Sequence, residues 1–294
     1  MQISYPEEYL YHYTGAGSLP HILIKDGGGK STLYATHMRF LNDESEFLTG
    51  LAVLNEVLES HSDKLNIDRE FLEYLIQTFE KKKDGMPLAG HYVTCFSSAL
   101  GLVDQWRGYA DQGLGFALGY KQADLKSMDE RYENVHFLQC IYDEDKQIEA
   151  VSQAIETEFA ELPANISTDK EVHGFVRNAL YPRRFSNIAI QLLRIKHPAY
   201  KQEQEWRLIV APRKKSKSKL AGIGQFKPKL NFRSNSRGLV PYYKVKMPDL
   251  QRIVVGPSAH QRDNVLALEL LLEERGASEQ LRNSVQLENI PFRA

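Results

Sequence analysis

The chain has 294 residues, of which 42% are hydrophobic and 26% charged, and its formal net charge is −1. These proportions are typical of a globular protein, and the near-neutral charge excludes a global field that would attract nucleic acid or a membrane surface. The first residues lack the basic and apolar segments of a signal peptide, and no apolar run approaches membrane-spanning length. We therefore expect a cytoplasmic protein without membrane contact, in which Cys95 and Cys140 are buried, reduced thiols.

The apolar patterns predict strands and helices that do not alternate regularly along the chain. Strands are expected at 9–14, 32–36, 91–97, 114–120, 135–142, 203–210, 241–246, 252–256 and 284–289. Helices are expected at 16–25, 43–60, 68–82, 143–161, 170–195 with a bend at Pro182, and 261–275. This order predicts one α+β domain over residues 1–294, with helical insertions near 43–82 and 143–195.

The most informative stretch is the predicted strand at 203–210, because its side chains divide into an apolar and a charged face. Alternation places Trp206 and Leu208 on one face, and Glu203, Glu205 and Arg207 on the other. Two carboxylates and a guanidinium in this arrangement can line a ligand cleft. A surface strand with a weak Glu205–Arg207 ion pair is the structural alternative.

The segment that follows, residues 211–238, is predicted to be a basic loop. It contains nine Lys and Arg residues and no Asp or Glu. A solvated loop explains this composition, and so does a flap that contacts the phosphates of a nucleotide or polynucleotide.

Several common sites can be set aside. The run Gly27–Thr32 ends like a phosphate-binding P-loop, but Ile24 stands where that motif needs glycine. Rossmann glycines, a hydrolase Gly-x-Ser-x-Gly elbow and the His or Cys spacing of a zinc site are also missing from the sequence. We therefore expect no metal.

Three further clusters carry polar side chains that could line a cleft. His12 and Thr14 share one face of the first strand, although a lone histidine is often structural. Residues 40–46 combine a helix-capping Asn42 with acidic residues favoured by the helix dipole. Residues 95–98 carry Ser97 at a strand end, and a segment with Trp106 and Tyr109 follows, where Trp106 is expected to be a core residue.

Together these motifs follow a recognisable order along the chain. They are Tyr-His-Tyr-Thr at 11–14, Leu-Asn-Asp-x-x-Glu at 41–46, Cys-Phe-Ser at 95–97, Gln-Trp-x-x-Tyr-Ala at 105–110, Glu-x-Glu-Trp-Arg at 203–207 and Ile-Val-Val-Gly-Pro at 253–257. On these motifs the chain resembles the bacterial DUF2971 family over nearly its whole length. Their order is in turn similar to that of the ADP-ribosyltransferase superfamily, although the Ser-Thr-Ser pattern of that superfamily is here Cys-Phe-Ser-Ser.

The second resemblance implies an ADP-ribosyltransferase-like split β-sheet core that binds NAD as a substrate. It implies that Glu205 stabilises the positive charge that develops when the nicotinamide–ribose bond breaks, and that Glu203 orients or deprotonates the acceptor. His12 would hold the adenosine-side ribose with Thr14 beside it, and Ser97 would position Glu205 or the other ribose. The remaining implied contacts are stacking of Tyr13 or Tyr109 on nicotinamide and contact of Arg207 and the basic loop with the pyrophosphate.

We accordingly expect an NAD-dependent ADP-ribosyltransferase that modifies a macromolecule, either a protein or a nucleic acid. The resemblance suggests a toxin or phage-defence role with a regulatory partner such as an antitoxin. Two alternatives stay open: an NAD glycohydrolase that uses water as acceptor, and a non-catalytic module that binds a nucleotide or nucleic acid.

Overall fold

The computed structural model describes residues 8–41, 45–65, 90–159, 181–211, 226–235 and 238–292. The predicted helix at 68–82, the predicted cap Asn42 and most of the predicted basic loop lie outside these ranges. So does the part of the predicted helix 170–195 that precedes Tyr181.

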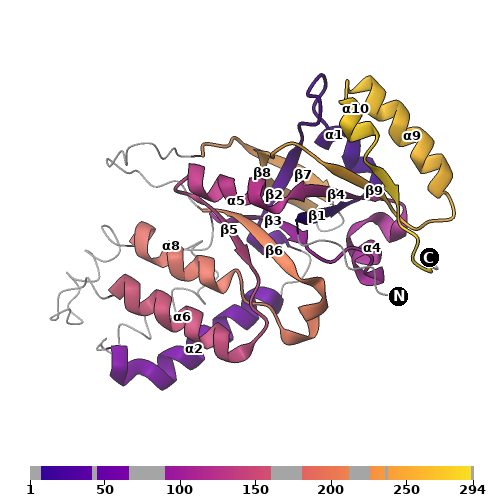
Figure 1. Cartoon of the computed structure of the whole chain (residues 1–294). Helices are drawn as coiled ribbons and strands as arrows, with labels where there is room; N and C mark the ends of the chain where they lie inside the picture. Colours follow the sequence, from indigo (N-terminus) through magenta and orange to yellow (C-terminus); the bar gives the residue numbers. More distant parts are fainter. Residues whose placement is uncertain are drawn as a thin grey trace.

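Within the described residues ten strands form one sheet, and all except β7 lie close to expected positions (Figure 1). They are β1 (Tyr9–Thr14), β2 (Thr32–His37), β3 (Tyr92–Ser97), β4 (Phe116–Lys121), β5 (Val135–Gln139), β6 (Glu205–Val210), β7 (Leu230–Asn235), β8 (Gly238–Lys246), β9 (Arg252–Val255) and β10 (Val285–Leu287). The main order is β10-β9-β4-β1-β3-β2-β8-β7, and β6 and β5 branch from β3.

The branch makes the sheet split beside β3. One edge of β3 pairs with β6 along its whole length, from Tyr92 to Ser97. On the other edge, β2 pairs at Tyr92 and Val93, whereas β1 meets β3 at Ser97. Between these two points β1 and β2 diverge, so the edge of β3 from Thr94 to Phe96 faces a gap in the sheet.

The helices pack on both faces of the sheet (Figure 1). They are α1 (Leu19–Ile22), α2 (Ser45–Leu65), α4 (Val103–Tyr109), α5 (Gln122–Arg131), α6 (Glu144–Phe159), α8 (Tyr181–Leu192), α9 (Gln261–Glu274) and α10 (Glu279–Arg282). The layer of α2, α6 and α8 buries its apolar side chains against Val93 of β3 and Ile209 of β6. A second core joins α1, α5, α9 and α10 to alternate residues of the strands, including Leu208 of β6.

Strand β6 is therefore buried on both faces, and this explains its sequence. Leu208 and Val210 enter one core while Ile209 enters the other, as alternation along a strand requires. The predicted strand began two residues too early, however. Glu203 ends a 3-10 helix (Pro198–Glu203), and Gln204 has a left-handed backbone with φ of 44° that turns the chain into β6.

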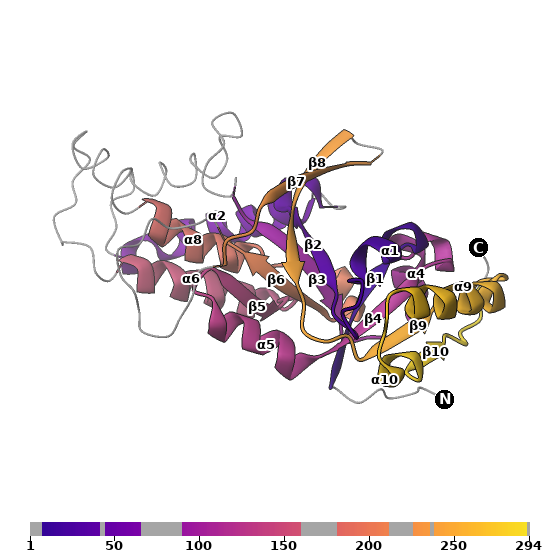
Figure 2. The same ribbon diagram turned by 90° about the horizontal axis from the view of Figure 1, so that it is seen from above.

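The predicted loop 211–238 is also partly wrong, because residues 230–235 form strand β7. This strand pairs with β8 in a hairpin, in which Leu230 lies opposite Tyr243 at the open end and Asn235 lies opposite Gly238 at the turn. Seen from above, the hairpin projects away from the body of the sheet (Figure 2). Helix α5, between β4 and β5, was not predicted either.

The architecture confirms an α+β class, with helices on a large, mostly antiparallel open sheet. Within the ranges that the structure describes, no helix combines the length and apolar character needed to cross a bilayer.

Candidate functional site

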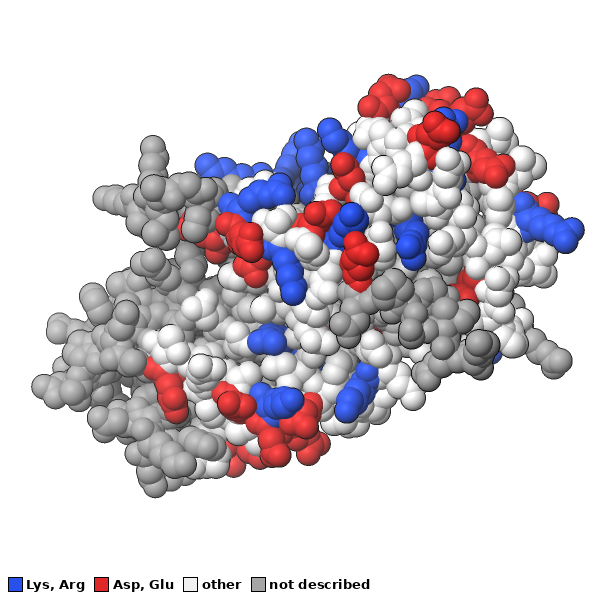
Figure 3. Space-filling view, in the orientation of Figure 1, with Lys and Arg blue, Asp and Glu red and all other residues white. Residues whose placement is uncertain are grey.

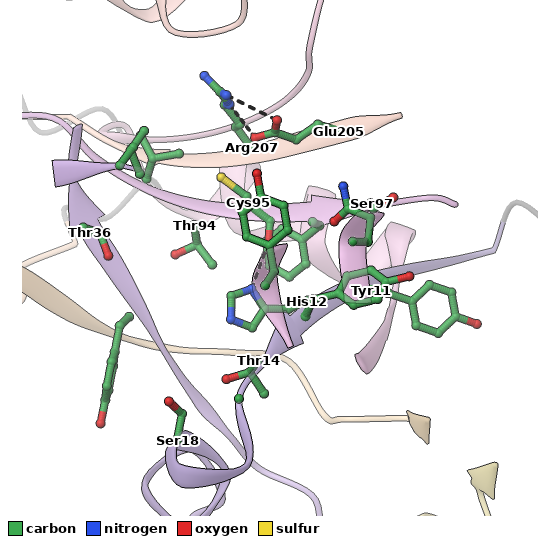
Figure 4. Close-up of a pocket in the computed structure, with 18 of the residues that line it drawn as sticks. Tyr11, His12, Thr14, Ser18, Thr36, Thr94, Cys95, Ser97, Glu205 and Arg207 are labelled. Carbon is green, nitrogen blue, oxygen red and sulfur yellow. Dashed lines mark hydrogen bonds and ion pairs between the residues drawn. The ribbon is translucent and has the colours of Figure 1, made fainter. Parts of the chain in front are cut away.

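A cavity of about 270 Å³ occupies the split between β1 and β2. Residues of β1, β2, β3 and β6 line it, together with residues of α1 and α4 and Arg233 of β7. Because Thr94 and Cys95 are successive residues of β3 and both line the cavity, it receives side chains from both faces of the sheet. Figure 4 shows Glu205 and Arg207 at one end of this space, and Thr14 and Ser18 at the other.

Four charged side chains form a buried cluster at the first end. Arg207 donates from Nε to Glu205 Oε1 at 2.7 Å and from Nη2 to Glu205 Oε2 at 3.3 Å. Lys196 Nζ lies 2.5 Å from both Glu205 Oε2 and Glu203 Oε2. Lys196, Glu205 and Arg207 are each at most 5% exposed, so each carboxylate needs these cations to offset its loss of hydration.

This cluster fixes the ionisation of Glu205. Burial acts to raise the pKa of its carboxyl, but the charges of Arg207 and Lys196, with hydrogen bonds from Arg207 and Cys95, lower the pKa to about 2. Glu205 is therefore an anion at neutral pH and cannot take up a proton there. It can stabilise a neighbouring positive charge but is a poor general base.

The backbone around both glutamates is held by neighbouring hydroxyls. Ser97 Oγ donates to the carbonyl oxygen of Glu203 at 2.5 Å and accepts from the Ala99 amide at 3.0 Å. The amide of Glu205 donates to Tyr142 Oη at 2.8 Å. Ser97 thus ties the end of β3 to the turn that precedes β6.

His12 of β1 lies on the other side of β3 from this cluster, on the opposite face of the sheet. Its Nδ1 is 2.9 Å from the carbonyl oxygen of Cys95, and since a carbonyl only accepts, Nδ1 carries the proton. Burial lowers the pKa of His12, so the ring is neutral at pH 7 and Nε2 is a hydrogen-bond acceptor. In Figure 4 the ring lies between β3 and Thr14, with Nδ1 turned to Cys95.

Hydroxyl groups surround this second part of the cavity. Thr14 and Thr94 are buried and line it. Within the described part of the chain, Thr94 Oγ1 has no hydrogen-bond partner although it is inaccessible to solvent. An orphaned buried hydroxyl beside a cavity is one that a polar ligand would satisfy.

The two predicted stacking residues differ in their surroundings. The ring of Tyr13 packs edge-on against Trp106, with centroids 4.9 Å apart, and its hydroxyl donates to Ala99 O. Tyr109, in contrast, is 39% exposed, and burial of its hydroxyl together with the charge of Glu203 raises its pKa. Tyr109 is therefore the one with a ring available for a ligand.

The two predicted phosphate contacts differ as well. The guanidinium of Arg207 is engaged with Glu205 and with the carbonyl oxygen of Leu193, at 2.6 Å from Nη1. Arg233, from the predicted basic loop, stands at the exposed side of the cavity and donates to Thr36 Oγ1 at 3.0 Å. Arg233 is thus better placed than Arg207 to meet a phosphate.

Lys196 and Thr94 contribute to the site but were not predicted from the sequence to belong to it. Lys196 ends an apolar run with Leu192, Leu193 and Ile195, and a lysine next to such a run is only a weak signal of burial. Thr94 lies in a predicted strand without any local feature that separates it from a core threonine.

All the predicted site residues line this one cavity: His12, Tyr13, Thr14, Ser97, Tyr109, Glu203, Glu205 and Arg207. Among the described residues, no group of three His, Cys, Asp or Glu side chains is arranged to hold a metal ion.

A model of the family described as "Protein of unknown function (DUF2971)" matches residues 105–208 of this chain. The match confirms the predicted resemblance to this family over residues 105–208, a segment that includes both glutamates. The resemblance over nearly the whole chain stays a prediction. No curated protein and no solved structure gave a significant match.

Proposed function

We propose that the split-sheet cavity binds NAD and that the protein transfers ADP-ribose from it to a macromolecule. The observation that carries the proposal is the placing of Glu203 and Glu205 at one end of a single cavity and of His12 and Thr14 at the other. The resemblance to ADP-ribosyltransferases implies a split sheet with a first-strand histidine and a late Glu-x-Glu at one ligand site. Here the two lie on opposite faces of the sheet, and the cavity reaches both.

The ionisation of Glu205 suits cleavage of the nicotinamide–ribose bond. As that bond breaks, nicotinamide leaves with the bonding electron pair and positive charge develops on the ribose. A carboxylate that is already ionised and held by Arg207 and Lys196 offers preorganised stabilisation of this charge. The acceptor nucleophile then forms the new bond to C1′.

The acceptor must lose a proton in the transfer step, and Glu203 is the group to receive it. Its side chain is 17% exposed, compared with 6% for Glu205, and it pairs with Lys196. Since Ser97 holds the carbonyl of Glu203, the position of this carboxylate is set by the backbone at the end of β3.

The rest of NAD would meet the polar groups at the other end of the cavity, on the opposite face of the sheet. Neutral His12 can accept a hydrogen bond from a ribose hydroxyl through Nε2, and Thr94 and Thr14 offer further partners. A volume of about 270 Å³ is at the small end for ligand sites, so part of a dinucleotide would extend past Arg233 towards solvent.

The acceptor class and the biological setting come from the resemblance. A toxin or phage-defence role with a regulatory partner remains part of the proposal, and so does water as acceptor, which would make the protein an NAD glycohydrolase. Both enzymes would use the same residues for bond cleavage.

One observation favours a second candidate, a non-catalytic module that binds a nucleotide. Both carboxylate oxygens of Glu205 are already occupied by Arg207 and Lys196. In this second candidate, Glu205 has a structural role in shaping the cavity and no catalytic role.

Incubating the purified protein with NAD, with and without cell lysate, separates these functions. We expect released nicotinamide, and a marked increase in its release when lysate supplies the acceptor. Release that lysate does not change identifies a glycohydrolase, and NAD that binds without being cleaved identifies a binding module. A protein that neither binds nor cleaves NAD contradicts both enzymatic functions and an NAD-binding module.

A further inference from the structure

The sheet face formed by β2, β7 and β8 is basic and aromatic where it borders the cavity. By alternation and register, one face of these strands carries Tyr34, Arg233, Tyr242, Lys244 and Lys246. None of the three strands contains an Asp or Glu. Figure 3 shows lysine and arginine side chains gathered along the upper part of the molecule, where β7 and β8 lie.

Two of the cations on this face, Arg233 and Lys244, lie against aromatic rings. The guanidinium of Arg233 lies 5.7 Å from the ring centroid of Tyr34 and 5.8 Å from that of Tyr242, and it donates to Thr36 Oγ1. Lys244 Nζ lies 5.9 Å from the ring of Tyr34. These contacts reduce the conformational freedom that each side chain would lose on binding an anion.

Arg233 connects this face to the proposed NAD cavity, which it lines together with Tyr34. Two more exposed cations, Lys227 and Lys229, stand just before β7. The five cations outnumber the two phosphates of a dinucleotide, which favours a ligand with more than two phosphates.

We propose that this face, defined by Tyr34, Arg233, Tyr242, Lys244 and Lys246, binds a single-stranded nucleic acid and leads it into the cavity. Positive charge that follows the backbone, combined with a ring on which a base can stack, is the combination that single strands require. Tyr34 is partly exposed and offers such a ring, whereas Tyr242 is buried behind it. The role of this strand as the ADP-ribose acceptor rests on the function proposed above, whereas its binding does not. In the transfer, a nitrogen or oxygen of the strand would bond to C1′ and give its proton to Glu203.

Fluorescence anisotropy with a labelled oligonucleotide of about 12 nucleotides, measured without NAD, tests the binding. We expect binding at low salt, and the logarithm of the binding constant should fall linearly with the logarithm of the salt concentration. The variant Arg233→Gln/Lys244→Gln/Lys246→Gln should bind at least about tenfold more weakly, and its salt slope should be lower by about 2 because three phosphate contacts are lost. Single-stranded DNA and RNA of the same sequence show which sugar is preferred.

The matched control removes three exposed cations from other surfaces, in Lys146→Gln/Arg262→Gln/Arg282→Gln, and should bind like the wild type. Equal losses in both variants, tighter binding of duplex DNA, or no binding at low salt would overturn the proposal. If the wild type binds the oligonucleotide but does not cleave NAD, the enzymatic function is refuted, whereas the proposed nucleic-acid-binding surface is supported.

Discussion

Lys196 and Arg207 hold two carboxylates in a region that water scarcely reaches, and the four charges balance. Such a cluster is stable only as a whole, because Lys196, Glu205 and Arg207 have lost their hydration and depend on their partners. With all four side chains present, the cluster fixes the position and charge of Glu205 more firmly than a surface ion pair could. The structure therefore rejects the surface-strand alternative for Glu205 and Arg207.

Removing Lys196 should be among the most destabilising changes in the molecule. Lys196→Met takes away the cation that both Glu203 and Glu205 contact, and we expect the free energy of unfolding to fall by about 3–5 kcal/mol. Denaturant unfolding followed by circular dichroism measures it.

Two controls accompany this variant. Lys25→Met removes an exposed pair with Glu274 and should cost less than about 1 kcal/mol. Adding Glu203→Gln to Lys196→Met restores the charge balance and should recover part of the loss. Similar small losses for Lys196→Met and Lys25→Met would show that the buried cluster contributes little.

The lowered pKa of Glu205 predicts a specific loss of stability in acid. A carboxyl whose pKa falls from about 4.5 to about 2 on folding stabilises the protein above pH 4.5, and this contribution disappears as the pH falls towards 2. It amounts to at most about 3 kcal/mol. In Glu205→Gln the unfolding free energy should depend less steeply on pH between 2.5 and 4.5, and identical slopes in both proteins would contradict the assigned ionisation.

At this scale the sequence predicted part of the site. Alternation within one strand was enough to group Glu205 with Arg207, and the neighbouring Glu203 came with them. Lys196 and Thr94 could not be assigned because their roles depend on which strands lie beside them, and this is decided by pairing between distant segments.

At the scale of elements, the split beside β3 is the feature that creates the cavity. Strands β1, β2 and β3 were each predicted from local patterns, yet their divergence depends on non-local registers that no local pattern contains. Strand β7 was missed because Asn231, Arg233 and Ser234 have little strand preference and lie in a basic segment. Its pairing with β8 overrides that preference.

Ser97 should be important for the junction between β3 and β6. Ser97→Ala leaves the Glu203 carbonyl and the Ala99 amide without this buried partner, so we expect a loss of about 1–3 kcal/mol in unfolding free energy. Ser98→Ala is the matched control, since its hydroxyl bonds an exposed side-chain oxygen of Gln204 and its loss should cost about 0.5 kcal/mol or less. Equal effects of the two substitutions would remove Ser97 from its anchoring role.

At the scale of the whole molecule, the two larger hydrophobic cores share the strands β3 and β6. The helical layer of α2, α6 and α8 therefore packs directly on the central sheet and extends its core. A single domain should consequently unfold in one cooperative step.

Adjacent residues on opposite faces of β6 test this cooperativity. Leu208→Ala opens one core and Ile209→Ala the other, and each should lower the free energy of unfolding by about 2–5 kcal/mol. Both variants should keep a single transition in which helical and tyrosine signals coincide. A separate early transition in Ile209→Ala, seen in the helical signal alone, would show instead that the helical layer unfolds independently.

The most direct test of the central claim is the rate of nicotinamide release from NAD by the wild type and by Glu205→Gln, with NAD affinity measured alongside. If the single variant fails to fold, Lys196→Met/Glu205→Gln restores the charge balance and serves instead. We predict a rate at least about a hundredfold lower in a folded variant that still binds NAD, because the substitution removes the charge that stabilises the ribose cation. Release at nearly the wild-type rate by a folded Glu205→Gln variant would contradict the account.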